Sequence, residues 1–588
     1  MTGKTYGSIE KIIAAAAAFL AVAGFNLLYG IRGESTMFSN SVFCMAAFGA
    51  FLFLNQHILN QNPDRRTLLY GLVGGLLAAA MTCMGCALNY TDTIWHGSVF
   101  GAILCLTPFF SGCVILGLLV LEEGKSAPWK YQKPGVRWFL ICWMLLFFLW
   151  IPVLLASWPG IFSYDSGWQL ASFVDGEVTG HHPILHTFLL GITREIGRGV
   201  FGTNNAGAAI YSLLQMILMS AMYAYVCYYL KKRQAPEWLQ IGTFLFLGIH
   251  PVNSLMALCA TKDSLFTGVF AVFLVQLFEM AEDREGFFSS LIRQVMFCMN
   301  VFFLFALRNN GFHTFVLCVP FLLWAFREYW KRMGILILIC LSLYGLYTGP
   351  VYQVLGIEQS DPREMCSVLM QSAARAYNLD YQGLTEQERE AFLSIIEEEG
   401  MQSYMSRFAD PVKAYFNGKE FAKNPGPFLK AWCSVGLRHK KLYIDSFLAN
   451  TFGYWYPGNS IEDTDHGRDY FEYYCKEFRE DVNVVMEPKL PALSEFYRRI
   501  GNESSFQKVP VVAASFNLGV YTWLFLFALL LLFYRQQYGE LILIIPLLMY
   551  FLTTLLGPVV KMRYHYPLIA CAPLIIFLIW RRDREWIK

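Results

Sequence analysis

Charged residues are scarce in this sequence, and no segment of it forms a basic stripe. Asp, Glu, Lys and Arg make up only 15% of the 588 residues, and the formal net charge is +2. Proteins that bind nucleic acids usually carry a strongly basic domain or stripe, because contacts to the phosphate backbone dominate their affinity. The composition therefore argues against a nucleic-acid partner.

Cysteine is nearly absent from the polar part of the chain. The sequence has 15 cysteines, but only Cys366, Cys433 and Cys475 fall in the long polar region 351–512. At most one disulfide can form there, so we do not expect a disulfide framework. The C-x-x-C motif at 83–86 has no second pair of ligands nearby, which favours helix packing over a metal site.

Apolar residues, in contrast, make up 56% of the chain and occur in long runs. A helical run of about 17 or more apolar residues can cross the hydrocarbon core of a bilayer. The sequence therefore predicts an all-α polytopic membrane protein with about 14 transmembrane helices. The first run has no signal-peptide cleavage site after it, so we expect it to be retained. The predicted spans are 11–31, 38–59, 67–88, 97–121, 137–156, 207–230, 239–256, 265–281, 293–307, 311–326, 334–350, 513–534, 540–557 and 565–580.

Lysines and arginines are distributed unequally between the loops on the two sides of the membrane. With a cytoplasmic N-terminus, the cytoplasmic segments contain about three times as many as the outer segments when the long region 351–512 is left out. An excess of this kind is typical of cytoplasmic loops. We therefore expect a cell-membrane protein with both termini in the cytoplasm. The loop after the fifth span and residues 351–512 are expected on the outer side.

Several of the few cations expected on the outer side directly adjoin a span. They are Lys262 in ATKDSLF, Arg308 in ALRNNGF, and Lys561 and Arg563 in VVKMRYHYP. A lysine or arginine in such a place often reaches to the lipid headgroups. An anion at the edge of a low-dielectric region also needs a paired cation, so these residues could instead hold a lipid-linked phosphate.

The outer loop 157–206 opens with SWPGIFSYDSGWQ, in which Asp165 follows the fifth span closely. This aspartate is therefore held near the membrane surface. Its carboxylate could take a proton from an acceptor hydroxyl, or it could cap the turn at Ser166 and Gly167. Tyr164, directly before it, is a candidate for substrate binding.

Aromatic, amide and imidazole side chains follow in the same loop. Trp168 and Gln169 could stack on a sugar and hydrogen-bond to it, although aromatic residues are common at membrane interfaces in any case. His181, His182 and His186 could bind a substrate or a metal, or they could be hydrogen-bonded parts of the fold.

A helix is predicted to start at His182 and Pro183, because proline is tolerated at the first position of a helix. Apolar residues from Leu185 to Ile196 recur at helical spacing, and the opposite face carries polar residues such as Arg194. This pattern predicts an amphipathic helix that lies in the outer membrane interface.

The polar region 351–512 contains more acidic than basic residues and many helix formers, as in TEQEREAFLSIIEEEGMQSYMSRF. The composition predicts a compact, mostly helical domain outside the membrane. Its segment FGYWYPG, residues 452–458, concentrates aromatic side chains beside a turn. We expect a hydrophobic cluster there, with an aromatic platform for a glycan or a lipid headgroup as the alternative.

The predicted topology resembles that of the GT-C superfamily of integral-membrane glycosyltransferases. The shared features are a span that leads outward, a loop that opens with an aspartate in YDSGWQ, and an interfacial helix. The segments PGIFSYDSGWQ, HHPILHT, LRNNG and RYHYP are similar to those of a bacterial multi-spanning family placed near these enzymes. The likeness covers 137–350, which would form a GT-C-like core, and the three-span segment 513–588. In GT-C enzymes the acidic loop follows the first span, so residues 1–136 would be a four-span extension.

This resemblance implies the transfer of a sugar from a polyprenyl-phosphate donor to a hydroxyl of a cell-envelope glycan, lipid or protein. Asp165 matches the catalytic acidic position, and Asp263 in TKDSLF is the alternative base. Arg308 and Arg563, and more weakly Lys262, match the cations that hold the donor phosphate. With one base and an in-line displacement, inversion at the anomeric carbon is expected.

The paired acidic motif of the metal-dependent GT-C members is not evident, so a requirement for Mg²⁺ or Mn²⁺ is left open. A transporter or flippase of lipid-linked glycans is the second hypothesis. A membrane scaffold that presents 351–512 to partners is the third, although it gives no reason for the Asp165 loop or the outer cations.

Overall fold

The computed structural model describes residues 8–33, 41–123, 134–458 and 472–581. Within these ranges the regular secondary structure consists of helices, and β-pairing is limited to isolated bridges. The predicted all-α fold class is therefore confirmed for the described part of the chain.

Ten helices in the described ranges are long and apolar enough to cross a membrane, judged by length and composition. Three further apolar helices are shorter, namely Glu237–Ile249, Leu291–Leu307 and Ile545–Thr554. These helices agree with a multi-pass membrane protein, whereas the number of 14 spans stays a prediction. The ten long helices are Ile9–Ile31, Ser41–Asn60, Arg65–Thr91, Gly97–Glu122, Val136–Ala156, Asn204–Lys232, Lys262–Glu282, Arg327–Val354, Leu518–Arg535 and Met562–Trp580.

Two predicted spans are interrupted by proline. The span 239–256 is divided at His250, whose backbone is extended and which precedes Pro251. A residue before proline is driven away from helical geometry, and the proline itself has no N–H to donate. The resulting helices are α9 (Glu237–Ile249) and α10 (Pro251–Met256). The last span is likewise divided, into α28 (Met562–Ala570) and α29 (Ala572–Trp580), which has Pro573 in its first turn.

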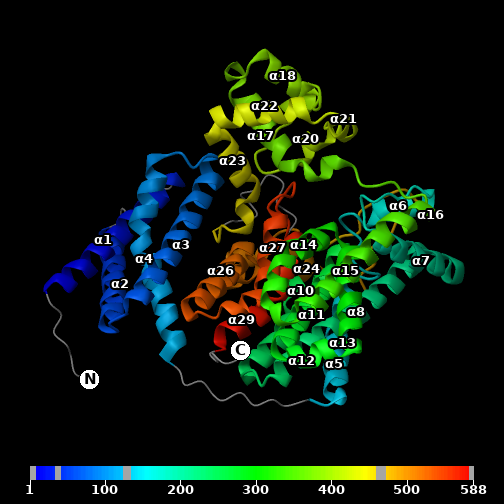
Figure 1. Ribbon diagram of the computed structural model, residues 1–588, viewed down its shortest axis with the longest axis horizontal. Helices are drawn as coiled ribbons and strands as arrows, with labels where there is room; N and C mark the ends of the chain where they lie inside the picture. The colour runs from blue at the N-terminus through cyan, green and yellow to red at the C-terminus, as the bar shows by residue number, and fades with distance from the viewer. Residues whose placement is uncertain (1–7, 34–40, 124–133, 459–471, 582–588) are drawn as a thin grey trace.

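The first four helices pack together as a unit, drawn in blue in Figure 1. Gly71 and Gly75 allow a close approach of the third and fourth helices, because a Cβ atom at either position would collide with a side chain or backbone of the fourth. On the outer surface of this unit, Phe53 and Leu104 are 73% and 72% exposed, as suits contact with lipid. The four helices are α1 (Ser8–Ile31), α2 (Ser41–Asn60), α3 (Arg65–Thr91) and α4 (Gly97–Glu123).

The larger helical group is built around α11 (Lys262–Glu282). Nearly all of its side chains are buried, and α28 packs directly against it. Both helices begin at one end of the group, where their first residues are neighbours. The surrounding helices are α5 (Val136–Ala156), α8 (Asn204–Lys232), α13 (Leu291–Leu307), α14 (Asn309–Ala325), α15 (Trp330–Leu346), α26 (Leu518–Arg535) and α27 (Ile545–Thr554).

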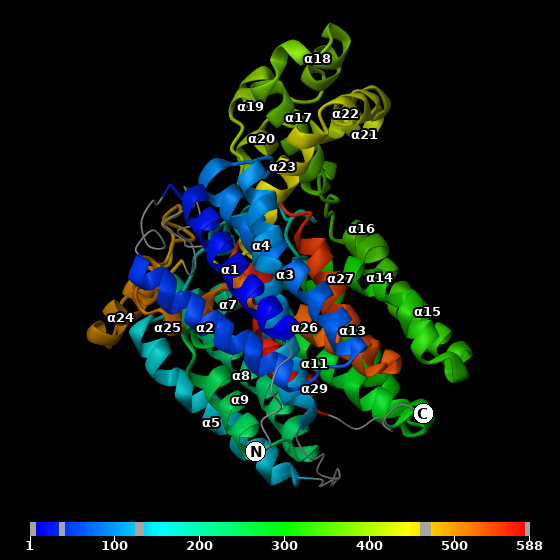
Figure 2. The ribbon, with the colours of Figure 1, turned by 90° about the vertical axis from the view of Figure 1, so that its left-hand side faces the viewer.

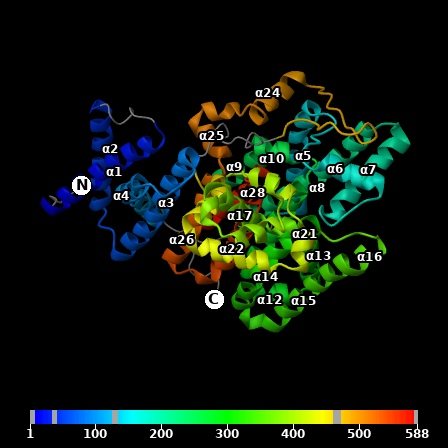
Figure 3. The same ribbon diagram turned by 90° about the horizontal axis from the view of Figure 1, so that it is seen from above.

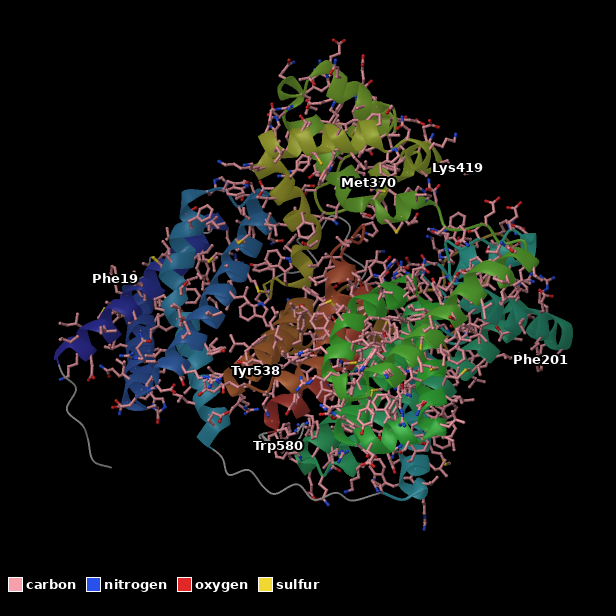
Figure 4. The ribbon with its side chains drawn as sticks, viewed as in Figure 1. Phe19, Phe201, Met370, Lys419, Tyr538 and Trp580 are labelled. Atoms are coloured by element: carbon pink, nitrogen blue, oxygen red, sulfur yellow. The ribbon has the colours of Figure 1, made fainter. Side chains whose placement is uncertain are left out.

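Two helices follow α5 at that same end: α6 (Ser166–Asp175) and α7 (Ile184–Phe201). The helix predicted after Pro183 is α7. Its polar residues His186 and Arg194 are buried against the protein, whereas the apolar Ile192 and Ile196 are exposed. Figure 4 shows Phe201, the last residue of α7, at the edge of the molecule. An outward apolar face agrees with a helix that lies in a membrane interface.

A separate helical domain, the upper domain (residues 362–451), stands above the long helices in Figure 2. It has its own hydrophobic core, which contains Met370, while Lys419 lies at its edge (Figure 4). Its helices are α17 (Ser367–Leu379), α18 (Glu386–Leu393), α19 (Glu398–Gln402), α20 (Asp410–Ala414), α21 (Gly418–Lys423), α22 (Gly426–Arg438) and α23 (Lys440–Thr451).

An ion pair and a second polar contact connect the upper domain to the two helical groups below it. The Arg375 guanidinium lies 2.9 Å from a carboxylate oxygen of Asp92, in the turn between α3 and α4. On the other side, Glu364 lies 3.6 Å from the imidazole of His181, in the loop between α6 and α7. The upper domain therefore contacts the N-terminal unit and the larger helical group at once.

Residues 472–512 of the predicted outer region do not belong to the upper domain. Residues 472–489, here called the strap, run along the loop that follows α5. The Lys476 N–H donates to the Phe162 carbonyl (2.9 Å), and the Lys489 N–H donates to the Leu155 carbonyl (2.7 Å). Beyond the strap, α24 (Pro491–Gly501) packs on α5, and α25 (Pro510–Phe516) follows it (Figure 3).

The aromatic segment FGYWYPG lies inside the molecule. The side chains of Phe452, Tyr454, Trp455 and Tyr456 are all buried, and the ring of Tyr454 stacks on that of His565. A hydrophobic cluster is therefore present, but it packs against helices of the larger group, such as α26 and α28, and not against the rest of the polar domain as expected. The alternative of an exposed platform for a glycan or a headgroup is wrong, because these faces are covered by protein.

Candidate functional site

Asp165 is the N-cap residue of α6 and lies at the end of a short, well-anchored loop. The loop is held to the segment before α11 by two backbone hydrogen bonds: Ile161 N–H to Leu258 O (3.2 Å) and Ala260 N–H to Ile161 O (2.8 Å). These bonds bring Asp165 next to the start of α11, about a hundred residues later in the sequence.

Two cations hold the Asp165 carboxylate. Lys262 Nζ lies 3.0 Å from Oδ2, and Arg563 Nη1 lies 2.9 Å from the same oxygen. The three residues come from the starts of α6, α11 and α28. Three of the residues predicted to form the site therefore meet, although they are far apart in the sequence.

A second ion pair lies directly beside the first. Arg308 donates to the buried carboxylate of Asp263, and Arg563 Nη1 lies 3.7 Å from the other oxygen of Asp263. The Tyr564 ring packs between the two guanidinium groups, 4.7 Å from that of Arg308 and 4.8 Å from that of Arg563. These stacked contacts fix the orientation of both arginines. We call Asp165, Lys262, Asp263, Arg308 and Arg563 the charged cluster.

Four helices begin at the charged cluster. Asp165 and Arg308 are the N-cap residues of α6 and α14, while Lys262 and Arg563 lie in the first turns of α11 and α28. A helix N-terminus carries a partial positive charge and unpaired N–H groups. Cations are unfavourable there unless an anion balances them. In the described residues the cluster contains three cations and two carboxylates, so its balance is positive.

The two carboxylates of the cluster differ in access to solvent. The Asp165 side chain is 26% exposed, whereas that of Asp263 is fully buried. Burial raises the pKa of Asp165, but Arg563 and Lys262 outweigh this effect and hold it well below its usual range. Asp165 is therefore an ionised carboxylate that a ligand can reach, while Asp263 serves as the buried counter-ion of Arg308.

His182 contacts the cluster, and His181 does not. His182 Nδ1 lies 3.2 Å from Lys262 Nζ. Burial and the nearby Lys262 lower the pKa of His182 to about 2, so its ring is neutral. Its Nδ1 therefore accepts a hydrogen bond from the Lys262 ammonium group. His181 faces Glu364 of the upper domain instead.

Gln169 and His186 are buried structural residues rather than surface ligands. His186 Nδ1 lies 3.0 Å from Gln169 Oε1, and its Nε2 lies 2.7 Å from the Tyr211 hydroxyl. Tyr211 donates in turn to Gln215, whose amide donates to the Cys259 carbonyl (2.8 Å) just before α11. This chain of hydrogen bonds joins α6, α7 and α8 behind the charged cluster, which is the alternative that the sequence left open for His186.

Trp168 and Tyr164 differ in their exposure to solvent. Trp168 is 60% exposed and packs edge-on against Phe478 of the strap. Tyr164 is buried, and the Arg563 guanidinium lies 4.6 Å from its ring centre. Trp168 is therefore available to a ligand at the surface, and Tyr164 supports the cluster from below.

The described residues contain no group of three or more His, Cys, Asp or Glu side chains that could hold a metal ion. The surroundings of Asp165 also do not suit a divalent cation, because Lys262 and Arg563 already occupy its carboxylate. A bound Mg²⁺ or Mn²⁺ would be repelled by both.

Glu472 of the strap and Lys561 were not predicted as a pair beside this site. The Tyr164 N–H donates to Glu472 Oε2 (2.6 Å), and Glu472 Oε1 lies 3.6 Å from Lys561 Nζ. Tyr564, between the two arginines, also went unnoticed within the RYHYP motif. Nothing in the local sequence around Glu472 distinguishes it from other acidic residues of the polar region.

Comparison with known proteins identifies a family but no individual relative. A family of unknown function, DUF6020, matches residues 174–588, a range that begins after Asp165 and includes Lys262, Asp263, Arg308 and Arg563. No curated protein and no solved structure shows significant similarity to the chain. Because the matched range covers more than half of the sequence, the protein belongs to the DUF6020 family.

Proposed function

We propose that this protein is a GT-C-type glycosyltransferase that moves a sugar from a polyprenyl-phosphate donor to a cell-envelope hydroxyl. One observation carries the proposal: the starts of four helices converge on a cluster with three cations and two carboxylates, beside apolar helices of membrane-spanning length. Excess positive charge at helix N-termini is suited to an anion such as a phosphate.

In this proposal Lys262 and Arg563 bind the donor phosphate, with Arg308 behind them. The acceptor hydroxyl attacks the anomeric carbon as the bond from that carbon to the phosphate oxygen breaks. The leaving polyprenyl phosphate gains negative charge during this step. Cations fixed in advance stabilise this charge more strongly in the transition state than in the bound donor, which is how they would accelerate transfer.

Asp165 takes the proton of the attacking hydroxyl. In the resting protein its carboxylate pairs with Lys262 and Arg563, the cations that a phosphate would also bind. A phosphate that attracts these two cations weakens their hold on Asp165 and raises its basicity. The donor would thus prepare the base, and one base with in-line displacement gives inversion at the anomeric carbon. These steps are written with side chains of the protein alone.

We place the charged cluster and the upper domain on the outer side of the cell membrane, with both termini in the cytoplasm. The excess of lysine and arginine in the opposite loops supports this orientation. A lipid-linked donor fits it, because nucleotide sugars are confined to the cytoplasm. The acceptor would then be a glycan, a lipid or a protein of the cell envelope.

The proposal is tested with purified wild type, Asp165→Asn and Asp175→Asn. Asp175 is a matched control, because it ends the same helix but pairs with Arg479 at the surface. Binding of polyprenyl phosphate is measured first, followed by transfer of radiolabelled sugar from polyprenyl-phosphate donors to cell-envelope extracts. We expect Asp165→Asn to bind donor and to lose about a thousandfold in rate, with Asp175→Asn unaffected.

Full activity of Asp165→Asn would contradict the assignment of the base. If the wild type transfers no sugar from any donor, the transferase proposal fails. Movement of labelled lipid-linked glycan across vesicles containing the wild type would then support a flippase.

A further inference from the structure

We propose that Glu472 is a positioning residue of this site, which holds the backbone of Tyr164 in the conformation that directs Asp165 toward Lys262 and Arg563. The inference concerns the geometry of the loop. It depends on the proposed function only for its activity readout, and its main test does not require catalysis.

Two reciprocal hydrogen bonds join Glu472 and Tyr164. The Tyr164 N–H donates to Glu472 Oε2 (2.6 Å), and the Glu472 N–H donates to the Tyr164 hydroxyl (3.3 Å). Glu472 is only 8% exposed, so its bond to Tyr164 is shielded from water. A charged acceptor in such surroundings forms one of the stronger hydrogen bonds found in proteins.

Tyr164 needs an external constraint because its backbone is in the left-handed region, with φ of 54°. Side chains with a Cβ atom rarely adopt this conformation, and a bulky residue does so only where its surroundings enforce it. Glycine would relieve the strain but would lose the ring that packs under Arg563. The strained residue directly precedes Asp165, so relaxation of its backbone would redirect the aspartate.

The strap fixes the position of Glu472 independently of Tyr164. Besides its bonds to Phe162 and Leu155, the strap donates from the Glu487 N–H to the Trp158 carbonyl (2.7 Å). It thus follows the whole loop between α5 and Asp165. A segment about three hundred residues later in the chain therefore sets the shape of the loop that carries the candidate base.

The test compares Glu472→Ala and Glu472→Gln with the wild type, and uses Glu487→Ala as a matched control. Glu487 belongs to the same strap, but its side chain is exposed and pairs with Lys489. Hydrogen–deuterium exchange of the full-length protein in detergent is measured for peptides that contain Tyr164. Peptides of the upper domain report whether the overall fold is retained.

We expect Glu472→Ala to accelerate exchange at the Tyr164 amide by roughly 10- to 100-fold, as for loss of a hydrogen bond to a charged acceptor. Glu472→Gln keeps an acceptor oxygen and should retain most of the protection, and Glu487→Ala should match the wild type. Unchanged exchange in Glu472→Ala would overturn the inference. Equal acceleration in Glu472→Ala and Glu487→Ala would also overturn it, because the effect would then come from the strap as a whole and not from the bond to Tyr164.

Transfer kinetics provide the second readout. Glu472→Ala should lower kcat about tenfold or more while the KM for the donor changes by no more than about twofold, since the phosphate-binding cations remain. Glu472→Gln should restore most of kcat. If the wild type proves inactive, the proposed function fails, but the exchange measurement still decides the role of Glu472.

Discussion

Arg563 and Asp165 are 398 positions apart in the sequence, and their charged groups lie 2.9 Å from each other. The pair joins the loop that follows α5 to α28, near the C-terminal end of the described residues. Because the side chain of Arg563 is nearly buried and also lies close to Asp263, it connects both carboxylates of the charged cluster. The site can therefore form only when the N-terminal and C-terminal parts of the larger helical group have assembled.

Replacement of Arg563 should weaken donor binding. We expect Arg563→Gln to reduce affinity for polyprenyl phosphate roughly 10- to 100-fold, in line with loss of one charge-assisted hydrogen bond. Arg479→Gln serves as control, because that arginine also pairs with an aspartate of α6 but is half exposed. Affinities are measured by titration of labelled polyprenyl phosphate into detergent-solubilised protein. Equal affinity of Arg563→Gln and wild type would contradict a phosphate site here.

The acid limb of the pH–rate profile should lie unusually low. The pKa of Asp165 is held well below its usual range by Arg563 and Lys262, so the free protein keeps an ionised base in mildly acidic solution. We expect kcat/KM to show no loss from protonation of Asp165 between about pH 5 and 8. In Lys262→Met one of the two cations is missing, the pKa of Asp165 rises, and the acid limb should move upward. A profile that does not move in this variant would contradict the ion pair.

Asp263→Asn should destabilise the protein more than Asp165→Asn does. The Asp263 side chain is fully buried, and its removal leaves the buried Arg308 without its main counter-ion. Breaking a buried ion pair on one side costs about 3–5 kcal/mol. Asp165 is partly exposed, and when it is replaced the nearby Asp263 still balances the charge of Arg563. Thermal unfolding in detergent compares the two variants, and equal melting temperatures would contradict this difference in environment.

His186 should make stability depend on pH. Burial lowers the pKa of His186 to about 3 in the folded protein, whereas the unfolded chain has a pKa near 6.5. Between these values the unfolded state binds more protons, so stability rises with pH and is lost as the pH falls below about 6.5. The slope is on the order of 1 kcal/mol per pH unit for one group.

The variant His186→Gln keeps polar contacts to Gln169 and Tyr211 but does not titrate. It should show a smaller change in melting temperature between about pH 7 and 5 than the wild type. His57→Gln is a control on α2, far from this chain of hydrogen bonds, and should leave the slope unchanged. An identical slope in His186→Gln and wild type would show that His186 is not the group that titrates.

The elements of the charged cluster could be predicted from the sequence, because each cation stands out at the end of an apolar run. The predicted alternation of spans puts Lys262, Arg308 and Arg563 on the same side of the membrane, so a common site for these three cations could be predicted. Their pairing was not, because it depends on which helices pack together. Asp165 was the first candidate for the base and Asp263 the alternative, and the sequence did not predict that the two differ in burial.

The remaining differences have tertiary causes. His186 and Gln169 resemble surface ligands in the sequence, and only their partners Tyr211 and Gln215 on α8 show them to be interior residues. Glu472 gives no local signal, because its role comes from Tyr164 in a distant loop. The division of a span at His250 follows from the proline after it and was within reach of the sequence.

The upper domain is joined by Arg375 to Asp92 of the N-terminal unit and by Glu364 to His181, next to the histidine that contacts Lys262. It thus adds a second connection between two groups of helices that also contact each other through α3 and α26. A displacement of the upper domain would therefore act on the loop between α6 and α7 and, through His182, on Lys262.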